Sequence, residues 1–186
     1  MAGRLKHLVR GLPCLLGVCL AGSLGAGPAE GIKPVKSLEL LADQDGVRSG
    51  ESLRLAVKVS LDGEYHVNSH VPSEEFLIPT TFELSPPEGL ASGAWEFPKG
   101  KSKKFPFSDT PLSIYDGTFI IQGSLKAAAG SSPGQKQVRG VLKYQACTSQ
   151  RCFPPKKEEV TLVVQVVPPG APVQHLHPEI FQPAVP

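Results

Sequence analysis

Apolar and polar residues alternate with a period of two over long stretches of this chain, and this alternation constrains the fold more than any other feature. Between Leu53 and Leu61 every odd-numbered residue is apolar, and alternate residues from Val160 to Val166 repeat the pattern. Successive side chains of a strand point to opposite faces, so each stretch predicts a strand with one buried face. The same reasoning predicts strands at 37–41, 65–68, 80–84, 118–125 and 138–146.

Turn-forming residues separate these predicted strands. Clusters of Gly, Pro, Asp and Ser occupy 43–46, 85–89 and 130–134. The 19 glycines and 19 prolines among 186 residues also favour turns over long helices. Seven or more short strands at this spacing predict an all-β fold, an immunoglobulin-like two-sheet antiparallel β-sandwich. A small closed barrel is the alternative.

The N-terminal residues have the organisation of an export signal. The basic residues Arg4, Lys6 and Arg10 precede an apolar run at 12–20, and small residues follow. We expect 1–29 to be a cleaved signal peptide, with an uncleaved anchor or a lipid-anchored Cys19 as alternatives. The sandwich domain is then expected over 30–168, and 169–186 is expected to form an extended, loosely attached Pro-rich tail.

Loss of this signal would leave two cysteines, Cys147 and Cys152, and an even pair in an exported protein indicates a disulfide. Closing a loop of about six residues stabilises a fold by about 2 kcal/mol in the chain-entropy model, against more than 4 for a loop of about 100. A short loop instead keeps a resolving thiol close, and Arg151 would favour a thiolate at Cys152. From the residues alone, two interpretations of the cysteines remain open: a redox-active pair and a structural disulfide.

The residues around the cysteines resemble the N-terminal periplasmic domain of DsbD, the bacterial thiol:disulfide interchange protein. Its active-site loop has the form Tyr-Gln-x-Cys, a few residues, then Cys-x-Pro-Pro, which matches Tyr144–Cys147 and Cys152–Pro155. The segment 66–80 resembles the family's cap-loop region, and 104–117 is similar to a central family segment. The resemblance covers residues 32–168.

The resemblance implies an immunoglobulin-like periplasmic domain that relays electrons by dithiol/disulfide exchange. In the family the second cysteine forms the mixed disulfide with partners, here Cys152, and Cys147 would be the resolving thiol. A cap loop covers the disulfide through an aromatic residue flanked by acidic ones. The residues expected to modulate the pair are Glu74, Glu75, Phe76, Tyr144 and Arg151.

The resemblance also implies partners. In the family a membrane domain reduces a thioredoxin-like domain, which reduces this domain, and disulfide isomerases or cytochrome c maturation thioredoxins accept the electrons. This sequence holds neither of the other two domains, so we expect the donor and the membrane electron transporter on separate chains. Four residues separate the cysteines, one fewer than in the best-known members. The alternative function is a non-enzymatic immunoglobulin-like periplasmic binding module with a structural disulfide.

Other chemistries lack matching motifs. His175 and His177 do not combine with the cysteines at any usual zinc spacing, and no phosphate-binding glycine motif occurs, so we expect no metal and no cofactor. His66 and His70 accompany no Gly-x-Ser-x-Gly elbow and are interpreted as strand and loop residues.

The basic run 99–104 lacks interleaved aromatics and predicts a solvated loop. Without residues 1–29 the basic groups fall from 19 to 16 against 17 acidic ones, so nucleic acid is not expected as a partner.

Overall fold

The alternating stretches form strands that pair into two facing sheets in the computed structural model, which describes residues 31–181. The expected signal peptide, 1–29, lies outside the described residues. Between residues 31 and 181 no segment forms a helix with the length and apolar character needed to cross a bilayer. The strands are β1 (Val35–Ala42), β2 (Gly46–Arg48), β3 (Ser52–Leu61), β4 (His66–Asn68), β5 (Thr81–Ser85), β6 (Leu90–Ser92), β7 (Lys101–Lys103), β8 (Leu112–Asp116), β9 (Thr118–Ala127), β10 (Gly134–Tyr144), β11 (Ala146–Cys147) and β12 (Lys156–Val167).

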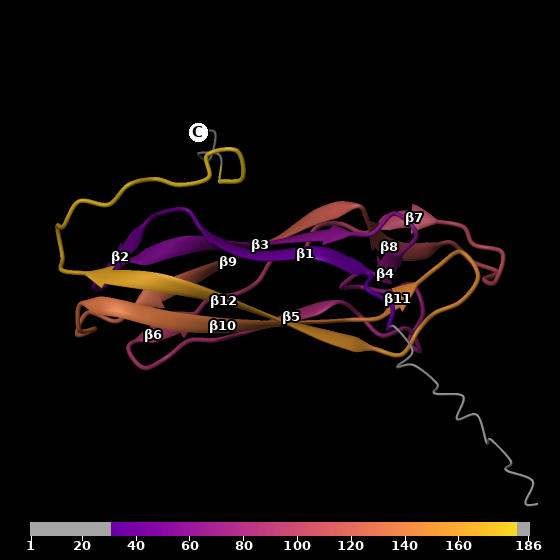
Figure 1. Ribbon diagram of the computed structural model, residues 1–186, viewed down its shortest axis with the longest axis horizontal. Coiled ribbons are helices and arrows are strands. Elements are labelled where there is room, and N and C mark those ends of the chain that lie inside the picture. The colour runs from indigo at the N-terminus through magenta and orange to yellow at the C-terminus, as the bar shows by residue number, and fades with distance from the viewer. Residues whose placement is uncertain (1–30, 182–186) are drawn as a thin grey trace, which may run out of the picture. The chain divides into compact units, whose positions relative to one another are not determined.

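The first sheet has the order β1-β3-β9-β6 and the second β2-β12-β10-β5 (Figure 1). Alternate residues of β3, from Leu53 to Leu61, are buried between them, as the alternation predicts. From the second sheet Val138, Leu142 and Val166 enter the same core. Burying each such side chain contributes about 1.5–3 kcal/mol. The prediction of an all-β immunoglobulin-like sandwich is therefore confirmed.

A third sheet, β11-β4-β8-β7, lies at one end of the sandwich, where its four labels gather in Figure 1. The sequence does not predict this sheet, because β7 and β11 are too short to show a period. The basic run, interpreted as a solvated loop, contributes Lys101–Lys103 as an edge strand paired with β8. Lysines on an edge strand keep other chains from pairing with it. Nor is the pairing wholly antiparallel, since the short β2 runs parallel to the end of β12.

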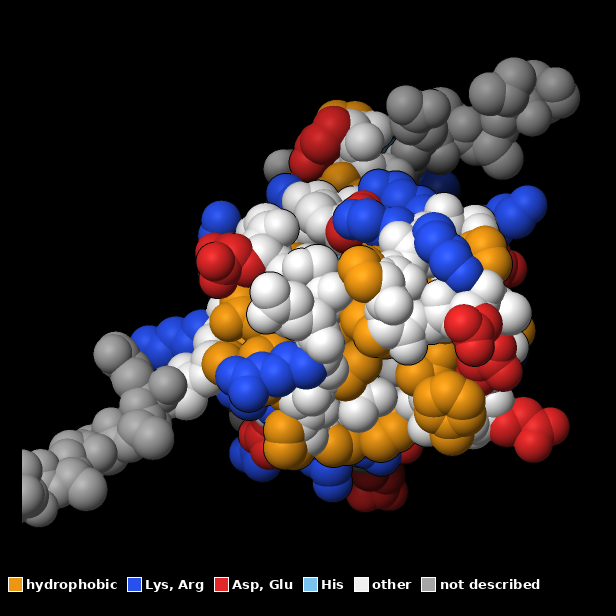
Figure 2. Space-filling view, turned by 90° about the vertical axis from the view of Figure 1, so that its right-hand side faces the viewer, with side chains coloured by type: hydrophobic (Ala, Val, Ile, Leu, Met, Phe, Trp, Pro, Cys, Tyr) orange, Lys and Arg blue, Asp and Glu red, His pale blue; other side chains and the backbone are white. Residues whose placement is uncertain are grey.

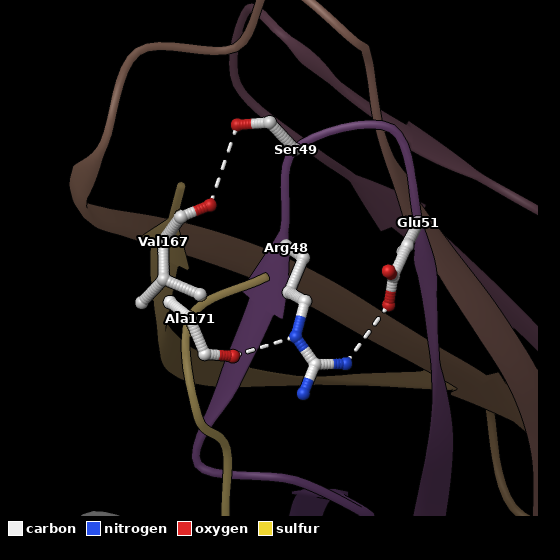
Figure 3. Close-up of polar contacts among 5 residues, drawn as sticks. All are labelled: Arg48, Ser49, Glu51, Val167 and Ala171. Atoms are coloured by element: carbon white, nitrogen blue, oxygen red, sulfur yellow. Dashed lines mark hydrogen bonds and ion pairs between the residues drawn. The ribbon is translucent and has the colours of Figure 1, made fainter. Parts of the chain in front are cut away.

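The Pro-rich segment after β12 is attached to the sandwich, so the expectation of loose attachment is wrong for the residues described. Arg48 Nε donates to the carbonyl oxygen of Ala171 at 2.6 Å, and the same guanidinium pairs with Glu51 at 3.1 Å (Figure 3). Further along, Leu176 N donates to Asp43 O, and Phe181 is buried beneath the guanidinium of Arg54. Composition alone indicates an extended chain but does not reveal these contacts.

Gly140 allows close packing in the second sheet. A Cβ at this position would lie 2.2 Å from the ring of Phe82, which packs edge-on against Trp95. We expect Gly140→Ala to lower the free energy of unfolding by about 1–3 kcal/mol, because the ring must shift within a packed core. Chemical denaturation measures this change. Gly130→Ala is the matched control, since nothing lies within 4 Å of its Cβ. Equal stability of the two variants would contradict the packing argument.

Candidate functional site

The two cysteines close a turn at the edge of the third sheet. Cys147 ends β11, and Cys152 forms a bridge back to it across a Cα–Cα distance of 3.9 Å. Two backbone hydrogen bonds hold this turn, one from Thr148 N to Arg151 O and one from Phe153 N to Ala146 O, each 2.9 Å long. A disulfide joins the cysteines. The pairing expected from the cysteine count is therefore present in the folded chain.

Burial distinguishes the two cysteines. Cys147 is 1% exposed, whereas Cys152 is exposed. An incoming thiolate must reach a sulfur to exchange with the disulfide, so access favours attack at Cys152. The thiol released from a buried position remains beside the bond that it can later re-form. The turn thus presents one sulfur to solvent and retains the other.

Gln145 connects the turn to the rest of the third sheet. Its Nε2 donates to Phe153 O at 3.2 Å, and its Oε1 accepts a hydrogen bond from Asn68 Nδ2 at 3.2 Å. Asn68 Nδ2 also donates to Ile78 O at 3.0 Å, in the segment expected to form the cap. Asn68 is fully buried, and the sequence places it in the segment that resembles the cap-loop region without assigning it a role. One hydrogen-bonded path therefore links the cysteine turn, β4 and the cap segment.

Tyr144 and Arg151, both predicted to modulate the cysteines, occupy different environments. Tyr144 is buried in the main core and donates to Glu158 Oε1 at 3.1 Å, and burial together with that carboxylate raises the pKa of Tyr144. Arg151 is exposed, with its guanidinium carbon 4.9 Å from the centre of the Phe153 ring. Tyr144 thus supports the strand leading into the turn, while Arg151 carries positive charge beside it.

The cap segment, residues 73–78, contacts neighbouring parts of the fold, whereas the side chain of its aromatic residue is exposed. Glu74 accepts a hydrogen bond from Thr110 at 2.7 Å, and Leu77 packs against the small cluster that contains Phe105. Phe76 is 81% exposed, which rules out core packing as its role. Because Cys152 is exposed too, the ring does not seal the disulfide in this arrangement. Covering the sulfurs would need a second arrangement of the segment, which stays a prediction.

Exposed apolar side chains gather at this end of the molecule. Figure 2 looks onto this end and shows apolar groups with charged side chains around them. Large exposed apolar residues cluster in the two segments beside the third sheet, namely Val71, Phe76, Ile78 and Phe107. Contiguous exposed apolar surface rimmed by polar groups is typical of protein interaction sites.

Comparison with known proteins identifies the family. The family model for the N-terminal region of the thiol:disulfide interchange protein DsbD matches residues 39–164. This chain belongs to that family. The match includes the cysteine turn and both of the other segments quoted for the resemblance, so the assignment made from the sequence is confirmed. The DsbD N-terminal family is one of thiol–disulfide exchange, which is the chemistry that a short-loop disulfide with one exposed cysteine permits.

Solved structures show more distant likenesses. The N-terminal periplasmic domain of ScsB from Proteus mirabilis is 16% identical, with a TM-score of 0.48 over 68% of this chain and 46% of that one. This chain thus spans about half of that structure's length. The GAE domain of GGA2p from Saccharomyces cerevisiae is 12% identical, with a TM-score of 0.38 over 73% of this chain and 92% of that one. No curated protein matches the sequence.

His66 lies beside the DsbD-type cysteine turn, although the sequence marks it only as a strand residue. It pairs directly with Cys147 across β4 and β11 and is buried. Burial chiefly lowers the pKa of His66 to about 4, with Lys103 acting in the same direction and Asp116 opposing it. A polar cleft of about 740 Å³ borders this position, lined among others by Lys101, Lys103, Asp116 and Gln150. Predicting this neighbour requires the strand register, which the sequence does not show.

Proposed function

We propose that this DsbD N-terminal-type domain is a periplasmic protein-disulfide reductase module that passes electrons through the Cys147/Cys152 pair. The observation that carries the proposal is the contrast in burial between the two cysteines of one short turn. In the reduced protein the Cys152 thiolate attacks a partner disulfide and forms a mixed disulfide. Cys147 then attacks Cys152, re-forms the internal disulfide and releases the partner as a dithiol, so two electrons leave the domain.

The proposed partners are thioredoxin-fold proteins. A thioredoxin-like donor, itself reduced by a membrane electron transporter, would reduce the disulfide, and disulfide isomerases or cytochrome c maturation thioredoxins would accept the electrons. The exposed apolar residues in the segments beside the third sheet support docking of another protein at this end of the sandwich. An N-terminal signal peptide, 1–29, would bring the chain to the periplasm. The competing function is a binding module in which the same disulfide is only structural.

The reduction potential distinguishes these two functions. Structural disulfides of secreted proteins have potentials below about −300 mV, whereas exchangeable ones lie higher. We expect the Cys147–Cys152 pair to equilibrate with a glutathione or thioredoxin buffer at a potential above about −300 mV, because one sulfur is accessible and the loop is short. Gel-shift analysis of the alkylated thiols measures the oxidised fraction. A pair that stays fully oxidised in all such buffers would favour the structural disulfide.

A further inference from the structure

Three residues of the third sheet stand side by side on neighbouring strands. Cys147 of β11 pairs directly with His66 of β4, and His66 pairs directly with Asp116 of β8. Directly opposite residues of antiparallel strands project from the same face, with Cβ atoms about 4.5–5.5 Å apart. The fold therefore aligns a thiol, an imidazole and a carboxylate in one row across the sheet.

The imidazole in this row is buried without a complete set of partners. His66 is 4% exposed, and its ring stacks on Phe105 with centroids 4.3 Å apart. Its Nε2 has no hydrogen-bond partner among the described residues. A buried polar atom left unpaired destabilises the protein, so its presence calls for an explanation. A hydrogen-bond partner that exists only in the reduced protein would explain the unpaired Nε2. The thiol of Cys147 is such a group, because it lies directly opposite His66.

We propose that His66 is the general base that takes the proton of Cys147 when this thiol resolves a mixed disulfide, and that Asp116 stabilises the resulting imidazolium. This inference rests on the proposed function, because it assigns a role within the exchange reaction. It concerns the buried thiol only. Cys152 is exposed, and water can serve it as proton acceptor.

The reaction balances without any further reactant. In the mixed disulfide, Cys152 Sγ is bonded to the partner sulfur and Cys147 carries its proton. His66 Nε2 accepts that proton, and the electron pair left on Cys147 Sγ forms the bond to Cys152 Sγ. The bond from Cys152 to the partner sulfur breaks, and its electron pair leaves with the partner as a thiolate. The proton on His66 then passes to this thiolate or to water.

The charges around the row act on this transfer in both directions. Because the pKa of His66 lies at about 4, the ring is neutral near pH 7 and its unpaired Nε2 is open to a proton. In this environment, however, the ring is a weak base, so the transfer depends on the charges that form with it. Burial disfavours a lone thiolate and a lone imidazolium, but it strengthens their attraction once both are formed together. Asp116 stays ionised, since a hydrogen bond from Lys101 at 2.5 Å lowers the pKa of this carboxyl. Lys103 of β7 opposes protonation of His66, and Lys101 and Glu64 line the same cleft.

The role of His66 is tested by reacting the reduced protein with an aromatic disulfide, which releases its two thiolates in two steps. One equivalent of 5,5′-dithiobis(2-nitrobenzoate) added to the reduced protein gives a first thionitrobenzoate when Cys152 attacks and a second when Cys147 resolves. General bases contribute about 10²-fold or more, so we expect His66→Phe to slow the second phase by about a hundredfold at pH 7. The loss should shrink as the pH rises, because hydroxide then replaces the base. The first phase should keep its rate.

Matched variants separate this role from folding. His70→Phe makes the same change in a ring that also stacks on a phenylalanine, Phe97 at 3.8 Å, but pairs with no cysteine, and it should leave both phases unchanged. His66→Gln repeats the test if His66→Phe melts early. An unchanged second phase in a folded His66 variant would overturn the general base. If the unaltered protein does not release the second equivalent of thionitrobenzoate, the proposed function is overturned instead.

Discussion

Cys147→Ala is expected to accumulate a stable mixed disulfide through Cys152 when it meets an oxidised thioredoxin-fold partner. The exposed Cys152 can still attack, but the variant has no internal thiol to resolve the intermediate. Cys152→Ala should trap at least about tenfold less, because its remaining thiol is buried at 1% exposure. Non-reducing electrophoresis with mass spectrometry of the adduct measures both yields.

Matched conditions make the comparison decisive. Both variants are reduced, freed of reductant and mixed with the same oxidised thioredoxin, and the unaltered protein, which keeps both cysteines, serves as the control. That control should show no lasting adduct, since it can resolve the mixed disulfide. Equal trapping by the two cysteine variants would contradict the division of labour between Cys152 and Cys147. Trapping by neither would count against exchange with partners of this fold.

The long strands were predictable because each has one buried face. In β3 the alternation continues from Leu53 to Leu61, and the structure buries these residues as a set. Strands of two or three residues give no such signal. Lys101–Lys103 is polar throughout and pairs because β8 offers it an edge, which is a property of the assembled sheet. The third sheet, which positions the cysteines, is therefore the part that the sequence reveals least.

The same limit applies to the site. The cysteine turn was predictable from local residues, since Cys147 and Cys152 are close in sequence and flanked by a family motif. His66 and Asn68 lie about 80 residues earlier in the chain and reach the turn only through the pairing of β4 with β11. A two-residue strand such as β11 has no pattern that would set this register. Cross-strand neighbours of a short strand become visible only in the folded chain.

Hydrogen bonds link the cysteine turn to the segment that could cover it. Gln145 bonds both to Phe153 O in the turn and to Asn68, which also holds Ile78 O at the end of the cap segment. Glu74 and Leu77 anchor the segment to neighbouring residues. Phe76 lies between these anchored residues with its ring exposed. Replacing Phe76 tests whether its ring covers the disulfide in a second arrangement.

Phe76→Ala is expected to melt near the unaltered protein while its thiols and its disulfide react several-fold faster. A buried phenylalanine replaced by alanine costs about 3–5 kcal/mol, but a ring with 81% exposure has little packing to lose. If the ring covers the sulfurs part of the time, its removal opens access to small thiols and alkylating reagents. Glu74 and Glu75 remain in this variant, and because acidic neighbours disfavour a thiolate, they would act against the faster reaction.

Rates of alkylation by iodoacetamide and of reduction by a small thiol measure this change, alongside thermal melting. Phe107→Ala is the matched control, because Phe107 is also exposed on a segment beside the third sheet but stacks on Phe105 at 5.3 Å. That variant should lose some stability and keep its thiol reactivity, since its ring already has a fixed partner. Unchanged reactivity of Phe76→Ala with a large drop in melting temperature would show that Phe76 supports the fold and caps nothing.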